Sequence, residues 1–274
     1  MDFTGERFIP GQHIGIELEH LNRYYFVVNQ IDLKGKTVLD IASGEGYGSQ
    51  LLSQYAEQVI GVDISSEAVD HANGKYLSKN LNFVLGDAAC IPLENNSVDV
   101  IVSFETIEHH DKHIEMMKEI KRVLNPKGIL IISSPDKGFF LNSDKNEFHV
   151  KELFSDEFKE LIGQFFKNTY FYSQKIFSGS MIVLDQNSKE YKKPIIVNAD
   201  GLSREFTAVY NLAISTDVLD FTPSNQMVFY QKFEEVLSYT DLNKAVQAVS
   251  DSRAYRLGKF ILIPFSFIRR KLHI

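Results

Sequence analysis

The chain has 274 residues, of which 44% are hydrophobic and 24% are charged, so it can bury a large core as one domain with a small appendage. Its net charge of −7 excludes a protein whose whole surface binds nucleic acid. The single cysteine, Cys90, excludes a disulfide framework and fits a reducing compartment. We expect its thiol to be buried and inert. Residues 1–11 contain no apolar run, so we expect no signal peptide and a cytoplasmic protein.

Short apolar runs predict five buried strands, at residues 37–41, 58–63, 82–85, 98–104 and 129–133. Helices are expected in the gaps between them. The clearest is 112–124, which the sequence Asn125-Pro126-Lys127-Gly128 should end. Ser65 or Ser66 is expected to cap the helix that follows the second strand. Strands that are apolar throughout and alternate with helices indicate a parallel sheet covered on both faces.

The pattern changes after Pro135. Residues 148–166 have the spacing of an amphipathic helix, whereas 169–176 and 206–215 are rich in aromatic and β-branched residues. These two runs favour strands at an antiparallel edge of the sheet. Residues 178–205 are weakly patterned, and we interpret them as an insertion.

The C-terminal segment is basic. Residues 252–274 contain six Lys and Arg residues and no acidic residue, on both sides of the apolar run 260–268. That run is far below the roughly 20 apolar residues that a membrane-spanning helix needs. The tail favours either an interfacial anchor on an anionic membrane or a helix docked on the domain with a solvated basic rim. We therefore divide the chain into an N-terminal arm or lid with a helix (1–34), a central domain (35–220) and a helical extension with a basic amphipathic tail (221–274).

The strongest local motif is VLDIASGEGYGS, residues 38–49, a strand that ends in a glycine-rich turn and opens a helix. Such a turn brings bare backbone against a ligand. Ser49 stands where a dinucleotide-binding turn requires its third glycine. Asp40, inside the strand end, favours a cationic ligand such as an ammonium group.

Acidic residues also end the next two strands. Asp63 can accept both hydroxyls of a ribose, and Asp87 can accept from an adenine amino group. Ile64 and Ala88 would flank the ring. The alternative for each acid is a helix N-cap after a strand, but three acids at one sheet edge favour a nucleotide-like ligand.

In this order and spacing, VLDIASGEGYGS, GVDIS, GDA, VDVIVSFETIEH and IKRVLNPKGILIISSP resemble the class I S-adenosylmethionine-dependent methyltransferases over about residues 35–135. The resemblance implies a Rossmann-like, doubly wound, mostly parallel seven-stranded sheet with S-adenosylmethionine as cofactor. It places Ser103, Phe104 and Glu105 at the methyl-transfer site. The cofactor contacts that we expect are Asp40, Ala42, Gly44, Gly46, Asp63, Ile64, Asp87, Ala88 and Phe104. Arg7 should either pair with the cofactor carboxylate or tie the arm to the domain.

The flanks resemble a narrower group. TGERFIPG, IELEHLNRYYF and FHVKELFSDEF are similar to small methyltransferases encoded with bacterial surface-polysaccharide (O-antigen) enzymes, and SRAYRLGKFILIPFSFIRRKL resembles the tails of some bacterial glycosyltransferases. The resemblance implies O-methylation of a sugar, nucleotide-sugar or glycan end, a glycosyltransferase partner and a place at the inner face of the plasma membrane. The alternatives are a methyltransferase of a small lipid-like or secondary metabolite, and a catalytically silent cofactor-binding scaffold for a glycosyltransferase complex.

A hydroxyl acceptor must lose its proton during methyl transfer. In the segment Glu105-Thr106-Ile107-Glu108-His109, His109 is the expected general base, because a neutral imidazole suits that role near pH 7. His149 is the second candidate. Each has a structural alternative, as a residue at a helix start that only packs or bonds to backbone. We expect His110 and His113 to be solvated, and we expect no metal site.

Overall fold

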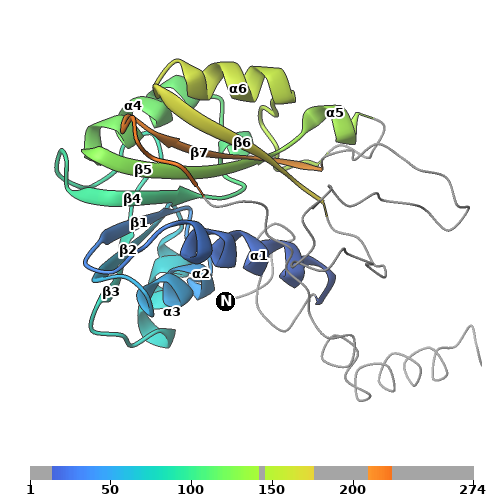
Figure 1. The fold of residues 1–274 in the computed structure, drawn as a ribbon. Helices are drawn as coiled ribbons and strands as arrows, with labels where there is room; N and C mark the ends of the chain where they lie inside the picture. The colour runs from blue at the N-terminus through green and yellow to red at the C-terminus, as the bar shows by residue number, and fades with distance from the viewer. Residues whose placement is uncertain (1–13, 142–145, 176–208, 224–274) are drawn as a thin grey trace, which may run out of the picture. The chain divides into compact units, whose positions relative to one another are not determined.

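A seven-stranded sheet runs through the computed structural model, which describes residues 14–141, 146–175 and 209–223 (Figure 1). The strand order is β3-β2-β1-β4-β5-β7-β6. The strands are β1 Thr37–Ile41, β2 Gln58–Asp63, β3 Leu81–Leu85, β4 Val98–Ser103, β5 Leu124–Pro135, β6 Asn168–Gln174 and β7 Tyr210–Thr216. Strands β1 to β5 are parallel, and β7 runs antiparallel to both β5 and β6. The predicted α/β fold with an antiparallel edge is confirmed.

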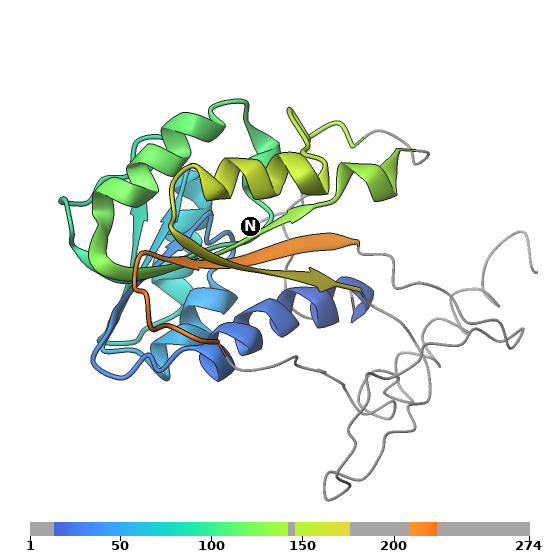
Figure 2. The same cartoon turned by 45° about the horizontal axis from the view of Figure 1, so that its top comes forward.

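Helices cover both faces of this sheet (Figures 1 and 2). On one face, α4 (His113–Val123) and α6 (Ser155–Gly163) pack on the sheet. The other face is covered by α1 (Ile14–Gln30), α2 (Tyr47–Ser53) and α3 (Ser66–Lys75). Two short helices, η1 (Ile107–His109) and α5 (Lys137–Phe140), follow the carboxyl ends of β4 and β5.

The burial of the central strand β1 explains its continuous apolar sequence, from which the strand was predicted. Val38, Leu39 and Ile41 of β1 are at most 1% exposed, because β1 lies between β2 and β4 and under helices on both faces. A continuous apolar run is what such a strand requires. The cap of α3 is also as expected, since the Ser65 side chain accepts a hydrogen bond from the Ala68 N–H at 3.3 Å.

The helix expected over 148–166 begins only at Ser155. The backbone N–H groups of Val150 and Lys151 both donate to the carbonyl oxygen of Glu108, at 2.8 and 3.0 Å. These bonds to a distant loop replace the i to i−4 bonds that a helix would need. The segment before α6 is therefore held against η1.

Two predictions about single side chains were wrong. Cys90 is exposed rather than buried. The gap between β3 and β4, where the sequence predicted a helix, forms a tight turn here, in which the Cys90 N–H bonds to the Asp87 carbonyl oxygen at 2.9 Å. His113 is only 4% exposed rather than solvated. It begins α4, and its ring bonds to the carbonyl oxygen of His110 at 2.8 Å.

Strand β5 begins at Leu124, earlier than expected, directly after α4. Its register with β4 shifts between the Leu124 and Ile129 pairs, so the predicted helix stop lies in this irregular part of the strand. Within the part of the chain that the structure describes, no helix combines the length and apolar character needed to cross a membrane. Arg7, the proposed insertion at 178–205 and the basic tail at 252–274 lie outside the described residues.

Replacement of Gly48 tests the packing of α1 on α2. A Cβ atom at this position would lie 1.9 Å from the Tyr24 ring, so we expect Gly48→Ala to displace α1 and to lower the free energy of unfolding by about 1–3 kcal/mol. Urea unfolding measures the change. The matched control is Gly74→Ala, where no atom lies within 4 Å of the added Cβ and a gain of about 0.5–1 kcal/mol is expected. Equal stability of the Gly48→Ala variant and the wild type would contradict the packing described.

Candidate functional site

The sheet has a natural binding position at the carboxyl end of β1. The strand order reverses there, since β2 lies on one side of β1 and β4 on the other, and ligands of open α/β sheets bind at such a point. The turn that follows has positive φ at Ala42 (57°), Gly44 (57°) and Gly46 (97°). A Cβ atom at Gly46 would also lie 2.9 Å from both Ala72 and Phe83. Glycine at position 46 is therefore required by both backbone conformation and space.

Asp63 fixes this turn from the end of β2. Its carboxylate accepts the Gly44 N–H at 2.8 Å and the Ser65 N–H at 2.9 Å, and the residue is 6% exposed. A carboxylate can accept about four hydrogen bonds. Asp63 can thus order the glycine turn and also accept from the hydroxyls of a ligand.

Apolar side chains are exposed beside Asp63. Ile64 is 73% exposed and Leu85 is 56% exposed, at the carboxyl ends of β2 and β3. Asp87 and Ala88 lie next to them and are partly exposed. Exposed apolar surface beside a carboxylate suits a flat, apolar ring that carries a hydrogen-bond donor. The assignment of Ile64, Asp87 and Ala88 to adenine stays a prediction, and Leu85 is an exposed apolar neighbour that the sequence analysis did not name.

Asp40 is completely buried below the turn. Its carboxylate accepts from the Ser49 hydroxyl at 2.6 Å and from the Tyr24 hydroxyl at 3.2 Å. Burial raises the pKa of Asp40 to about 7, although the hydrogen bonds from Ser49 and Tyr24 oppose the rise. Asp40 therefore joins β1 to α1 and α2, and its contact with a ligand ammonium group stays a prediction.

Glu45, which the sequence analysis missed, anchors the glycine turn to α3. This buried carboxylate accepts from Lys75 at 2.5 Å and Tyr76 at 2.6 Å, and it lies 2.9 Å from His71. Burial tends to raise the pKa of Glu45, but the bonds from Lys75, Tyr76 and His71 together lower it. The spacing of residues 71 and 75 on one helix face was the available signal.

The loop after β4 is held by a buried charged network. Glu105 has φ 50°, and its carboxylate accepts from the Ser133 hydroxyl at 2.5 Å and lies 3.6 Å from Arg23. Arg23 is 1% exposed and donates to Gln174 at 2.9 Å. Phe104 is buried and packs edge-on against Tyr24. Glu105, a predicted catalytic residue, thus also positions the β4 loop.

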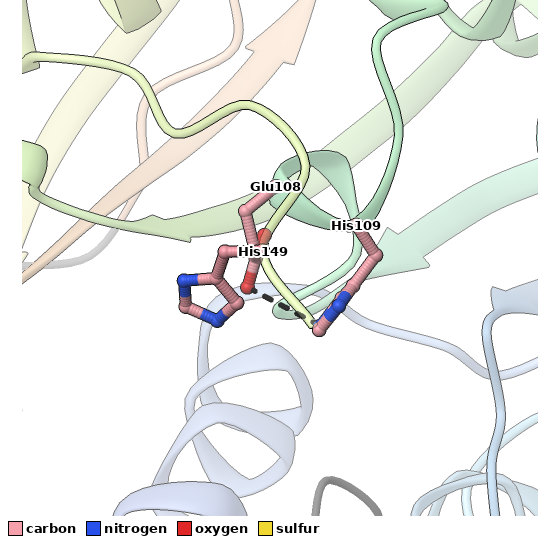
Figure 3. Close-up of side chains that lie close together, drawn as sticks. All are labelled: Glu108, His109 and His149. Atoms are coloured by element: carbon pink, nitrogen blue, oxygen red, sulfur yellow. Dashed lines mark ion pairs between the residues drawn. The ribbon is translucent and has the colours of Figure 1, made fainter. Parts of the chain in front are cut away.

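The two predicted base candidates lie together. The rings of His109 and His149 are 5.2 Å apart between centroids, and Glu108 lies beside them, with one carboxylate oxygen 3.9 Å from His109 Nε2 (Figure 3). Glu108 is 1% exposed, and sequence reasoning gave it no role. His110 lies apart from this group, with its Nε2 3.3 Å from the Met116 sulfur.

Known methyltransferases are similar to this chain in sequence. Residues 39–132 match the family described as "Methyltransferase domain". A "Probable S-adenosylmethionine-dependent methyltransferase" of Mycolicibacterium smegmatis is 34% identical over 167 residues, which cover 59% of this chain and 63% of that protein. A phthiotriol/phenolphthiotriol dimycocerosates methyltransferase of Mycobacterium leprae is 29% identical over 113 residues, or 40% of this chain and 42% of that protein. The matches thus span about three fifths or less of these relatives.

Solved structures share the fold. A SAM-dependent methyltransferase from Archaeoglobus fulgidus superposes with a TM-score of 0.54 at 18% identity, covering 74% of this chain and 94% of that one. The cyclase SpnF superposes with a TM-score of 0.51 at 19% identity, covering 61% and 64%. The fold is the Rossmann-like methyltransferase fold. The family match and the relatives show that residues 39–132 are similar to methyltransferase domains, and the relatives of 34% identity are described as probable S-adenosylmethionine-dependent methyltransferases.

The raised pKa of Asp40 predicts a pH-dependent stability. Because its pKa is about 7 in the folded protein and 3.8 in a free side chain, the folded state holds a proton between about pH 4 and 7 that the unfolded state releases. Raising the pH through this window therefore lowers the free energy of unfolding. The Asp40→Asn variant lacks this titration, so the stability of the wild type should fall relative to the variant, by on the order of a few kcal/mol. Urea unfolding of both proteins at pH 5 and pH 7 measures it, and parallel pH dependence would contradict the prediction.

Proposed function

We propose that the protein transfers a methyl group from S-adenosylmethionine to a hydroxyl group, and that the acceptor belongs to a sugar, a nucleotide-sugar or a glycan end. The observation that supports the cofactor most directly is the combined geometry of the glycine turn, Asp63 and the exposed Ile64 and Leu85. Asp63 would accept from the ribose hydroxyls, and the apolar pair would cover the adenine. When bound, the cofactor supplies a methyl group on a sulfonium, whose sulfur keeps the bonding electron pair as the new O–CH₃ bond forms.

The chain's own residues align the acceptor and take up its proton. Alignment of the acceptor oxygen with the methyl group can lower the barrier of such a displacement, by up to about 7–11 kcal/mol in the best intramolecular cases. The segment after β4 lies next to the glycine turn, since Ser103 pairs with Ile41. His109 is the base candidate in this segment. Its Nδ1 lies 3.2 Å from the Phe148 carbonyl oxygen, so Nε2 is the nitrogen suited to receive the proton.

A lipid-like hydroxyl is the second candidate acceptor. Relatives of 29–31% identity over about two fifths of this chain are phthiotriol/phenolphthiotriol dimycocerosates methyltransferases. The sugar acceptor rests on the resemblance of the flanking segments alone. Incubation with a radiolabelled methyl donor and parallel panels of nucleotide-sugars, glycan ends and lipid alcohols separates the two candidates.

Substitution of Asp63 tests the cofactor site. We expect Asp63→Ala to abolish S-adenosylmethionine binding in a calorimetric titration, because the ribose contact and the turn anchor are both lost. Asp63→Asn, which retains one acceptor for the Gly44 N–H, should keep the fold and weaken binding at least tenfold. Asp70→Ala on the exposed face of α3 is the control and should bind as the wild type does. No binding by the wild type would overturn the proposal.

Substitution of His109 tests the acceptor chemistry. With an acceptor found in the screen, His109→Ala should lower turnover by about 10²–10⁴-fold while its affinity for S-adenosylmethionine stays that of the wild type. His110→Ala removes the neighbouring ring, which faces Met116, and should keep most of the activity. Unchanged turnover in His109→Ala would remove His109 from the chemistry.

A further inference from the structure

We propose that Glu108, His109 and His149 form a binding site for a divalent transition-metal ion of the zinc or iron(II) kind. One ligand atom from each of the three side chains lies within 4.8 Å of the other two. Two imidazoles and one carboxylate are the ligand set of many catalytic zinc and non-haem iron(II) sites. Figure 3 shows the three side chains gathered where η1 meets the segment before α6.

The backbone holds the two halves of this site together. Glu108 and His109 belong to η1, whereas His149 comes from a segment 40 residues later in the sequence. The carbonyl oxygen of Glu108 accepts from both Val150 and Lys151, directly after His149. The three side chains are therefore brought together by backbone bonds and do not depend on a chance contact of surface side chains.

Both histidines have the hydrogen bonds that orient metal ligands. His109 Nδ1 lies 3.2 Å from the Phe148 carbonyl oxygen, and His149 Nδ1 lies 2.5 Å from the Glu152 carboxylate. A ring whose Nδ1–H donates to a carbonyl or carboxylate presents Nε2 to the ion, as in most histidine-ligated metal sites. Both histidines show this Nδ1 contact, and the contacts are independent of the distances between the three ligand atoms.

Charge and exposure also fit a cation. Glu108 is 1% exposed, and its carboxylate places a negative charge beside the two imidazoles. With Glu152 the site has two carboxylates around two imidazoles, which matches the charge of a divalent ion. Zinc ligands lie about 2.0–2.2 Å from the ion, so the three atoms must move closer together. The His109 and His149 side chains are 33% and 16% exposed, so neither ring is fully enclosed by protein.

The role of this ion rests on the proposed function. An acceptor hydroxyl bound to the ion would be more acidic, as zinc-bound water is. Its proton would pass to solvent, and the oxygen would form the O–CH₃ bond as the S–CH₃ bond breaks. In this form of the mechanism His109 is a ligand through Nε2, and the ion replaces it as the group that activates the hydroxyl.

Calorimetric titration of the metal-free full chain with Zn²⁺ tests the site itself. We expect one site, with affinity at least tenfold weaker in each of Glu108→Gln, His109→Ala and His149→Ala. Glu152→Ala should weaken binding by about 10–100-fold, because Glu152 positions a ligand. His71→Ala, on α3 and outside the cluster, is the matched control and should bind as the wild type does. Thermal unfolding without metal shows which variants are folded, and only folded variants are compared.

The outcomes are distinct. Zinc affinity equal in the wild type and in the folded ligand variants would overturn the proposal, since binding would then occur elsewhere. Mg²⁺ binding that survives the loss of both imidazoles would overturn it as well, because it would indicate a site of oxygen ligands. Binding of Zn²⁺ does not require the methyl donor, so the Asp63→Asn variant should retain it. Zinc binding without any methyl transfer would keep the metal site and overturn only the proposed function.

Discussion

The contact between the Tyr24 ring and Gly48 sets the geometry of the binding edge. The ring occupies the space where any side chain at position 48 would lie, and its hydroxyl reaches the buried carboxylate of Asp40. The same ring packs edge-on against Tyr47 and Phe104. Helix α1, the start of α2 and the ends of β1 and β4 therefore converge on one side chain. The glycine turn and the β4 loop depend on the docking of a helix that lies outside the glycine motif.

The fold was largely predictable because its central strands, β1 and β4 above all, are buried on both faces and show as apolar runs. The edge strand β3 is only partly buried, but Asp63 at the end of β2 and Asp87 shortly after β3 mark the same edge of the sheet. The segment before α6 was not predictable in the same way. Its apolar residues have helical spacing, but its N–H groups bond to Glu108, which is far away in sequence. Local periodicity carries no information about such a partner.

The site residues also fall into two groups, those placed by local structure and those placed by long-range contacts. Gly44, Gly46 and Asp63 lie where a strand–turn–helix motif predicts, since their geometry is local. The hydrogen-bond partners of Asp40 were not predictable from its own strand, because the hydroxyls that reach it come from two different helices. The sequence around Glu108 did not indicate a functional role, since an acidic residue next to a histidine is common. Only the fold brings His149 close to it. Side chains that act through long-range contacts are the part that sequence patterns miss.

Glu105 has a strained backbone conformation, with a positive φ at a residue that carries a side chain. A residue with a side chain at φ 50° costs about 1–2 kcal/mol relative to the same residue at negative φ. Glycine adopts positive φ without this cost. Glycine there would relieve the backbone strain but would leave the buried Arg23 without this carboxylate. The contacts of Glu105 with Ser133 and Arg23 therefore hold a strained backbone conformation in place. Such strained, side-chain-bearing positions are typical of loops whose task is recognition or chemistry.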